Sequence, residues 1–345
     1  MQFSTTALNV LLLVAMAIPG FILVKTKLVK PNAIQYFAAV LLYVSQPFLS
    51  LRSFLSVEYS VSLLKNLGIV LGVSFIVQAA VFLVLCLVLR RWFDKPCVTA
   101  GLIADGYVGS AMTVIPEDDA LKSQIAFTNR GRALRVMAMA SVFGNVGFFG
   151  VPLLQMLFPE HPQAIAYSAV YIVAMNLMCW TVGAYVLTGD KKYVSLKKAL
   201  INPQMIVLIV ALPLFFCGVT MNAIPSTVAK IIDYLADMTA PLCMLILGMR
   251  FALAPLKQLF CDWKVYFAAV FKNLVFPLIV YVILLPFSLD PMLRVALVLL
   301  SAMPVASITL NLAELFNCDQ KTAANSILLS TLLCILTIPI ILLLF

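Results

Sequence analysis

The chain has 345 residues, of which 63% are hydrophobic and only 11% are charged. Soluble domains average roughly 45–50% apolar and about 25% charged residues, so this chain has too few charges to cover a soluble surface. The bilayer is therefore the expected solvent. In that setting the formal net charge of +9 indicates loop orientation and argues against nucleic-acid binding.

Cysteine and histidine usage argues against two common kinds of site. The eight cysteines lie mostly in apolar runs without C-x-x-C spacing, and His161 is the single histidine, so neither a disulfide framework nor a metal centre is expected. The sequence contains no H-E-x-x-H, no G-x-S-x-G and no glycine-rich phosphate loop. We therefore expect no enzyme, no metal and no cofactor.

Ten apolar stretches approach the length of about 20 residues that a transmembrane helix needs. Their expected bounds are 7–24, 33–55, 66–89, 134–158, 164–187, 203–219, 229–249, 263–286, 291–316 and 322–345. Interruptions of these helices are expected at six prolines. These are Pro19, Pro47, Pro152, Pro213, Pro241 and Pro304. The expected fold class is an all-α polytopic membrane protein with ten transmembrane helices.

The segment 98–132, between the third and fourth stretches, does not fit a further span. Its apolar part contains Asp105 and three glycines, and the acidic run Glu117–Asp119 follows. A carboxylate at mid-bilayer is costly, which favours a cytoplasmic insertion of interfacial or amphipathic character. A re-entrant segment is the open alternative.

Basic residues set the expected orientation. Eighteen of the 23 Lys and Arg residues fall in the loops and helix ends after the odd-numbered stretches, including the runs Lys25–Lys30 and Lys191–Lys198. Only four fall on the opposite side, and Lys272 lies within a stretch. The positive-inside rule then predicts a multi-pass protein of the plasma membrane with both termini outside the cytoplasm.

The second half of the sequence repeats the first. Pro19 and Pro47 match Pro213 and Pro241 at an offset of 194 residues, whereas Arg135 matches Arg294 at an offset of 159. The difference of 35 residues agrees with the insertion near 98–132. We expect a first repeat over 1–187, a cytoplasmic linker over 188–202 and a second repeat over 203–345. Each repeat has five spans, an odd number, so the two repeats should be inverted, as in many secondary transporters.

The fourth and ninth stretches are expected to be broken helices that cross each other. Gly144, Asn145 and Gly147 interrupt the fourth, and Pro304 lies opposite Asn145 in the ninth. Free N–H groups and positive dipole ends at such breaks suit a carboxylate, so a small organic anion is the expected ligand. The alternative is close packing of small residues, with Asn145 bonded to a neighbouring helix.

Several segments resemble the auxin efflux carrier family. Residues 144–154 (GNVGFFGVPLL) resemble its fourth-helix signature, 235–242 (LADMTAPL) its seventh helix, and 301–307 (SAMPVAS) and 326–333 (SILLSTLL) its ninth and tenth helices. The resemblance covers essentially all ten stretches. It implies a fold like that of the bile acid:sodium symporters, with a scaffold domain and a crossover domain. It also implies export or uptake of a small organic anion such as auxin, malate or malonate.

The resemblance also implies site residues. Asn145 and Pro304 match the family's crossover positions, and Asn176 matches a polar position near substrate. The chain departs from plant members at Gly144, which is often proline there, and in its short central loop. The expected substrate-binding residues are Gly144, Asn145, Val146, Gly147, Asn176, Pro304, Val305, Ala306, Ser307 and Asn311.

Four further polar residues are candidates for coupling or charge compensation. Lys272 lies within the eighth stretch, and Gln78 is its counterpart at the 194 offset. Asp237 and Glu314 could carry protons. An intramembrane lysine is a functional candidate by default, but a buried ion pair between Lys272 and Asp237 is an equal alternative.

The sequence therefore predicts an elevator-like, alternating-access transporter of a small organic anion. A sodium-coupled symporter and a non-transporting membrane sensor are the alternatives. The expected partners are the anion and the lipid bilayer, without nucleic acid, and a homodimer is left open.

Overall fold

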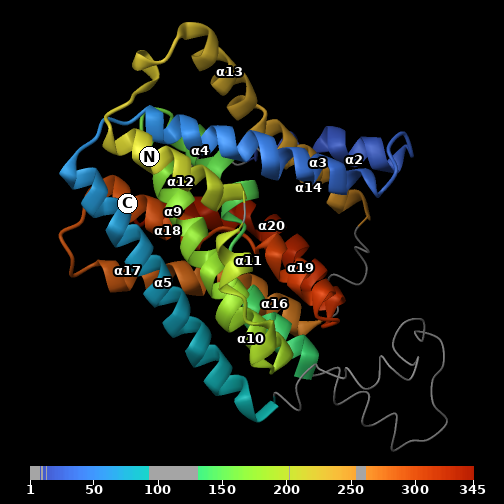
Figure 1. Cartoon of the computed structure of the whole chain (residues 1–345). Coiled ribbons are helices and arrows are strands. Elements are labelled where there is room, and N and C mark those ends of the chain that lie inside the picture. Colours follow the sequence, from blue (N-terminus) through green and yellow to red (C-terminus); the bar gives the residue numbers. More distant parts are fainter. Residues whose placement is uncertain (1–7, 9–10, 13, 93–130, 202, 254–261) are drawn as a thin grey trace, which may run out of the picture.

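The computed structural model describes residues 8, 11–12, 14–92, 131–201, 203–253 and 262–345 (Figure 1). All regular elements in this part are helices, and one isolated antiparallel bridge joins Gly144 to Val305. The expected insertion near 98–132 lies almost wholly outside the described residues, so that prediction stays untested.

The helices of the first half follow one another with short connections. They are α2 (Ile18–Lys25), α3 (Ala33–Val40), η1 (Leu41–Ser45), α4 (Gln46–Leu55), α5 (Val61–Leu89), η2 (Arg90–Trp92), η3 (Val146–Gly150), α8 (Val151–Leu157), α9 (Gln163–Met178), η4 (Cys179–Gly183) and α10 (Ala184–Thr188). Residues 131–140 are also helical.

The second half contains a similar succession. It consists of η5 (Lys191–Tyr193), α11 (Leu196–Leu200), α12 (Pro203–Phe216), η6 (Met221–Ala223), α13 (Ser226–Asp237), α14 (Thr239–Leu253), α16 (Trp263–Val270), η7 (Phe271–Val275), α17 (Phe276–Leu284), α18 (Pro291–Ser301), α19 (Ser307–Leu315) and α20 (Gln320–Leu342).

Six helical runs in the described residues are long and apolar enough to cross a membrane. They are Ala33–Leu55, Val61–Leu89, Gln163–Thr188, Ser226–Leu253, Trp263–Leu284 and Gln320–Leu342. Shorter apolar helices occupy Val146–Leu157, Ile206–Phe216 and Pro291–Ser301. The expected class, an all-α multi-pass membrane protein, is thus confirmed.

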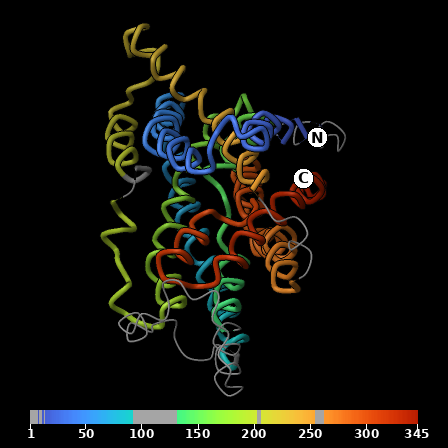
Figure 2. The backbone as a smooth tube through the Cα atoms, turned by 90° about the vertical axis from the view of Figure 1, so that its right-hand side faces the viewer, coloured from blue at the N-terminus to red at the C-terminus, as the bar shows by residue number. Residues whose placement is uncertain are grey.

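The helices pack in two groups (Figures 1 and 2). The scaffold group consists of α2, the run from α3 to α4, α12, α13 and α14, which lie together at the top of both views. The crossover group consists of α5, the runs from residue 131 to α8 and from α9 to α10, and the helices from α16 to α20. The groups meet where α4 and α12 contact α9, and where α14 contacts η3 and α8.

Four π-helical turns in the described part of the chain, η1, η3, η4 and η7, widen the helix backbone. Three of them end two residues before a proline, namely Pro47, Pro152 and Pro277. Proline has no N–H, and its ring clashes with the carbonyl four residues earlier, so a local π turn accommodates it inside a membrane helix. Such turns often lie at functional sites.

One of the expected proline interruptions is wrong, because Pro213 lies inside the continuous helix α12. The interruption expected at Pro241 is present: α13 ends at Asp237 and α14 begins at Thr239, with Pro241 in its first turn. The first turn of a helix tolerates proline because its N–H groups lack intrahelical acceptors, and neighbouring helices support a proline deeper in the span.

The scaffold group depends on a very close contact between α2 and α14. A Cβ atom added to Gly248 would lie 1.8 Å from the carbonyl oxygen of Ala17, and one added to Gly20 would lie 2.0 Å from that of Leu245. Glycine at both positions lets the two backbones touch, as in small-residue packing of membrane helices.

We expect Gly248→Ala to lower the free energy of unfolding by roughly 3 kcal/mol, because the added methyl group forces the two helices apart. Thermal melting of the purified protein in detergent measures this loss. Gly72→Ala on α5 is the matched control, since nothing lies within 4 Å of the position of its added Cβ atom. Equal melting temperatures for the two variants would contradict the close contact.

The linker between the expected repeats is an ordered turn. The Asp190 carboxylate accepts a hydrogen bond from the backbone N–H of Lys192 at 2.9 Å and lies 3.1 Å from its ammonium group. These contacts with Lys192 lower the pKa of the Asp190 carboxyl. Lys198 lies over the ring of Trp180 at 5.3 Å, which holds α11 against η4.

Candidate functional site

Two helical runs lose their helical geometry in the middle of the molecule. The first break covers residues 141–145, between the helix that ends at residue 140 and η3, and the second covers residues 302–306, between α18 and α19. Both breaks are buried. They lie where the sequence places Gly144 and Pro304, as expected.

Backbone hydrogen bonds join the two breaks. The N–H of Asn145 donates to the carbonyl of Pro304 at 2.6 Å, and the N–H of Ala306 donates to the carbonyl of Phe143 at 2.9 Å. Extended backbone inside a membrane is stable only when its polar groups are paired in this way. The breaks therefore form one unit, which we call the crossing, residues 141–145 with 302–306.

Asn145 caps the helix that follows the first break. Its side-chain oxygen accepts a hydrogen bond from the N–H of Phe148 at 3.3 Å, and Asn145 is 8% exposed. Because the cap uses the oxygen, the amide nitrogen Nδ2 is the remaining polar atom. No described residue accepts a hydrogen bond from it. Asn145 thus presents a donor at the positive end of the helix run Val146–Leu157.

Lys272 lies beside the crossing. Its ammonium group donates a hydrogen bond to the carbonyl of Ser301, the last residue of α18, and lies 4.7 Å from the ring centre of Phe276. A Cβ atom added to Gly144 would lie 3.1 Å from Lys272 Nζ. The ammonium group therefore neutralises the negative C-terminal end of α18 at the crossing.

The expected alternative pairing of Lys272 with Asp237 is wrong. Asp237 lies at the end of α13 and forms an ion pair with Arg52 at 2.7 Å, while Asp233 lies 3.4 Å from the same guanidinium group. Lys272 is fully buried in the crossover group, whereas the side chain of Asp237 is 66% exposed. Helix packing separates the two residues, and sequence offsets do not contain that information.

Asn273 and Ser330 hold the second break in place and were not expected from the sequence. Asn273 Nδ2 donates to the carbonyl of Ser330 at 2.6 Å, and the Ser330 hydroxyl accepts from the N–H of Val305 at 2.9 Å. The position of Asn273 beside the intramembrane Lys272 is the only sequence signal that could have found it. Ser330 carries no such signal, because a serine in an apolar helix is common.

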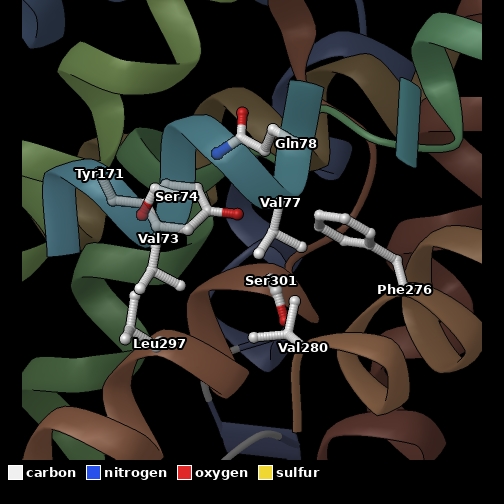
Figure 3. A pocket seen from close by; sticks show the side chains of 9 residues that line it. All are labelled: Val73, Ser74, Val77, Gln78, Tyr171, Phe276, Val280, Leu297 and Ser301. Carbon is white, nitrogen blue, oxygen red and sulfur yellow. The ribbon is translucent and has the colours of Figure 1, made fainter. Parts of the chain in front are cut away.

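Gln78 lies at a small cavity between α5, α9, α17 and α18 (Figure 3). The cavity measures about 10 Å³, close to the smallest volume that holds one water molecule. Ser74, Gln78 and the hydroxyl of Tyr171 supply polar groups on one side, and Phe276 and Ser301 line the other. An organic anion does not fit there, so Gln78 lies near the crossing without forming a substrate pocket.

The remaining expected residues lie at different distances from the crossing. Ser307 begins α19 and is half-buried, but Asn311 is exposed on the same helix. Asn176 is half-buried on α9, which packs against η3, and no hydrogen bond joins it to the described crossing residues. Glu314 is exposed and interacts electrostatically with Arg250 of the scaffold group.

Gln46 of α4 approaches the crossing from the scaffold group, and the sequence did not mark it. A Cβ atom added to Gly147 would lie 2.8 Å from Gln46 Nε2.

The charges at the crossing favour an anion. Two helix N-termini point to the crossing, at Val146 and at Ser307, and each contributes a partial positive charge. The ammonium group of Lys272 compensates the negative end of α18. A buried site with donors, positive dipole ends and a neighbouring cation can bind a carboxylate without further charge.

A partly polar site enclosed by membrane helices, at the boundary of two helix groups, is the arrangement of a membrane transporter. The sequence profile of the membrane transport protein family matches residues 191–342. The chain is 30% identical over 216 residues to an uncharacterized transporter of Methanocaldococcus jannaschii, an alignment that covers 62% of this chain and 69% of that protein.

A second relative is a provisionally named malonate transporter of Rhizobium meliloti. The two sequences are 25% identical over 216 residues. This alignment covers 59% of this chain and 64% of the relative, which is less than two thirds of the relative's length. The chain belongs to the membrane transport protein family, in which the auxin efflux carriers are grouped. This confirms the resemblance in the sequence, and the family and both relatives are described as transporters.

Proposed function

We propose that this protein is a secondary transporter that moves a small organic anion across the plasma membrane by alternating access. The crossover group carries the anion in an elevator-like movement against the scaffold group. The proposal depends most on the geometry of Asn145. Its side-chain oxygen caps the helix, so its Nδ2 donor remains available to a ligand at a buried helix N-terminus. Gly144, Gly147, Pro304, Val305 and Ala306 supply the backbone around it.

The proposed architecture is ten spans in two inverted repeats, 1–187 and 203–345, joined by the linker 188–202. Side-chain contacts support it. Gln78 and Phe82 of α5 precede Lys272 and Phe276 by 194 residues. The ring of Phe82 contacts that of Phe143 in the first break at 5.2 Å, while Lys272 contacts the end of α18 at the second break. Each repeat thus contributes one residue of this matched set that contacts a break or its flanking helix end, Phe82 at the first and Lys272 at the second.

Five spans in each repeat place the linker on one side of the membrane and both termini on the other, and the basic residues of the linker favour the cytoplasmic side for it. An impermeant maleimide is therefore expected to label Gln2→Cys in intact cells and to leave Lys192→Cys of the linker unlabelled, each measured in a background without native cysteines. Protection of position 2 with labelling of position 192 would reverse the orientation.

The substrate is proposed to be a short carboxylate, and a dicarboxylate such as malonate or malate fits better than auxin. The name of the Rhizobium meliloti relative supports malonate. Thermal melting with a series of mono- and dicarboxylates tests this, because a ligand that binds only the folded state raises the melting temperature. A saturable rise with at least one carboxylate is expected. No rise with any of them would contradict the proposal.

A sodium-coupled symporter is the second candidate within transport. Ser307, Thr309 and Asn311 supply neutral oxygen atoms near the second break. However, the ammonium group of Lys272 already lies at the negative end of α18, where it would repel a second cation. We therefore expect the carboxylate-induced rise to be the same in sodium and in choline buffers.

A further inference from the structure

Gln46 combines deep burial with an unused hydrogen-bond donor. The residue is 7% exposed, and its Nε2 atom is buried without a hydrogen-bond partner. Ser45, the preceding residue and the last of η1, is fully buried, and its hydroxyl has no partner either. An unpaired polar group away from water is costly to keep, so two adjacent ones indicate that a ligand supplies the acceptor in one functional state.

The amide of Gln46 lies at the same helix N-terminus as Asn145. It contacts Gly147, where a Cβ atom would lie 2.8 Å from Nε2 and would displace the amide. Gly147 belongs to the first turn of the helix run Val146–Leu157. In that turn the N–H of Val146 donates to the carbonyl of Gly144 and the N–H of Phe148 to Asn145 Oδ1, while the N–H of Gly147 has no acceptor among the described residues. Glycine at position 147 thus gives the amide access to this turn.

Asn145 is the N-cap residue of this helix run, and Gly147 lies in its first turn. The Asn145 amide and the Gln46 amide therefore approach the same helix N-terminus, each from a different helix group. Asn145 belongs to the crossover group, and Gln46 belongs to α4 of the scaffold group. A ligand that accepts hydrogen bonds from both donors therefore bridges the two helix groups, and a dicarboxylate can offer one carboxylate to each.

We propose that Gln46 is the scaffold-side ligand of the transported anion and makes the site selective for a dicarboxylate over a monocarboxylate. This inference rests on the proposed function. One carboxylate binds Asn145 Nδ2 and the helix N-terminus, and the second accepts a hydrogen bond from Gln46 Nε2. A monocarboxylate uses only the first set of donors.

Binding of malonate and of acetate to the purified protein tests this inference. The wild type is expected to bind malonate more tightly than acetate. Gln46→Leu keeps the size of the side chain and removes the donor, so malonate affinity should fall roughly ten- to a hundredfold, as for other hydrogen bonds to charged groups. Acetate affinity should stay within about threefold.

Gln35→Leu makes the same substitution at an exposed position of α3 in the scaffold group, and it should leave both affinities unchanged. Gln46→Glu replaces the donor by a negative charge of the same shape, so it should weaken malonate more than Gln46→Leu does. Equal losses for malonate and acetate, or no loss, in Gln46→Leu would overturn the inference and leave the proposed function standing. Failure of the wild type to bind either anion would overturn the proposed function as well.

Discussion

Asn145→Asp is expected to abolish anion binding while leaving the protein folded. An aspartate oxygen accepts the hydrogen bond from Phe148 N–H as the asparagine oxygen does, and aspartate is a preferred residue at a helix N-cap. The substitution replaces the free donor Nδ2 by a negatively charged oxygen. Loss of a donor to a charged group costs about 1.5–3 kcal/mol, and repulsion between two carboxylates adds further cost. We expect affinity to fall at least about a thousandfold.

Asn145→Ala is expected to lower stability more than Asn145→Asp does, but to weaken anion binding less. It removes both the cap and the donor, so the free energy of unfolding should fall by about 1 kcal/mol and anion affinity by roughly ten- to a hundredfold. The alanine variant is then the less stable of the two, and the aspartate variant is the weaker binder. If Asn145 only joined helices, affinity would follow melting temperature across the two variants, and this order would not be seen.

Lys272→Met is expected to weaken anion binding without loss of stability. Methionine has a similar length and flexibility but no charge. Lys272 Nζ lies beside the crossing. Two opposite charges on the order of 10 Å apart attract by about 2 kcal/mol at an effective dielectric constant of about 20, which corresponds to roughly a thirtyfold change in affinity. No described carboxylate pairs with Lys272, so removing its charge relieves a desolvation cost that offsets the lost hydrogen bond to the Ser301 carbonyl.

Lys264→Met is the matched control for this substitution. Lys264 lies in α16, one residue after its start, and pairs with Asp262 at 2.8 Å away from the crossing. Its replacement should leave anion affinity unchanged. Equal affinity of wild type and Lys272→Met, measured by titration of the purified proteins, would remove Lys272 from the charge balance of the site.

The sequence predicted the features that depend on local backbone chemistry. Glycines around Asn145 and a proline at position 304 interrupt otherwise apolar helices, and the breaks occur there because these residues weaken helical hydrogen bonding at their own positions. The long apolar helices follow from composition alone. The family was visible because the motif at 144–154 combines several such positions.

The sequence could not predict contacts between distant helices. Lys272 binds the carbonyl of Ser301 instead of the Asp237 carboxylate, and a backbone acceptor leaves no trace in the sequence. Gln46 reaches Gly147 only because η1 and the packing of α4 bring it there. Pro213 was expected to break α12, but tertiary support from neighbouring helices overrides its local effect.

Uptake of radiolabelled malonate into sealed proteoliposomes tests most directly whether the crossing carries an anion across the membrane. Wild-type protein and Asn145→Asp are reconstituted at equal amounts, with liposomes free of protein as background. We expect saturable uptake by the wild type, equal in sodium and choline buffers, and uptake at background for Asn145→Asp. Saturable malonate binding by the wild type with uptake no higher than in protein-free liposomes would contradict transport and would identify a sensor built on a transporter fold.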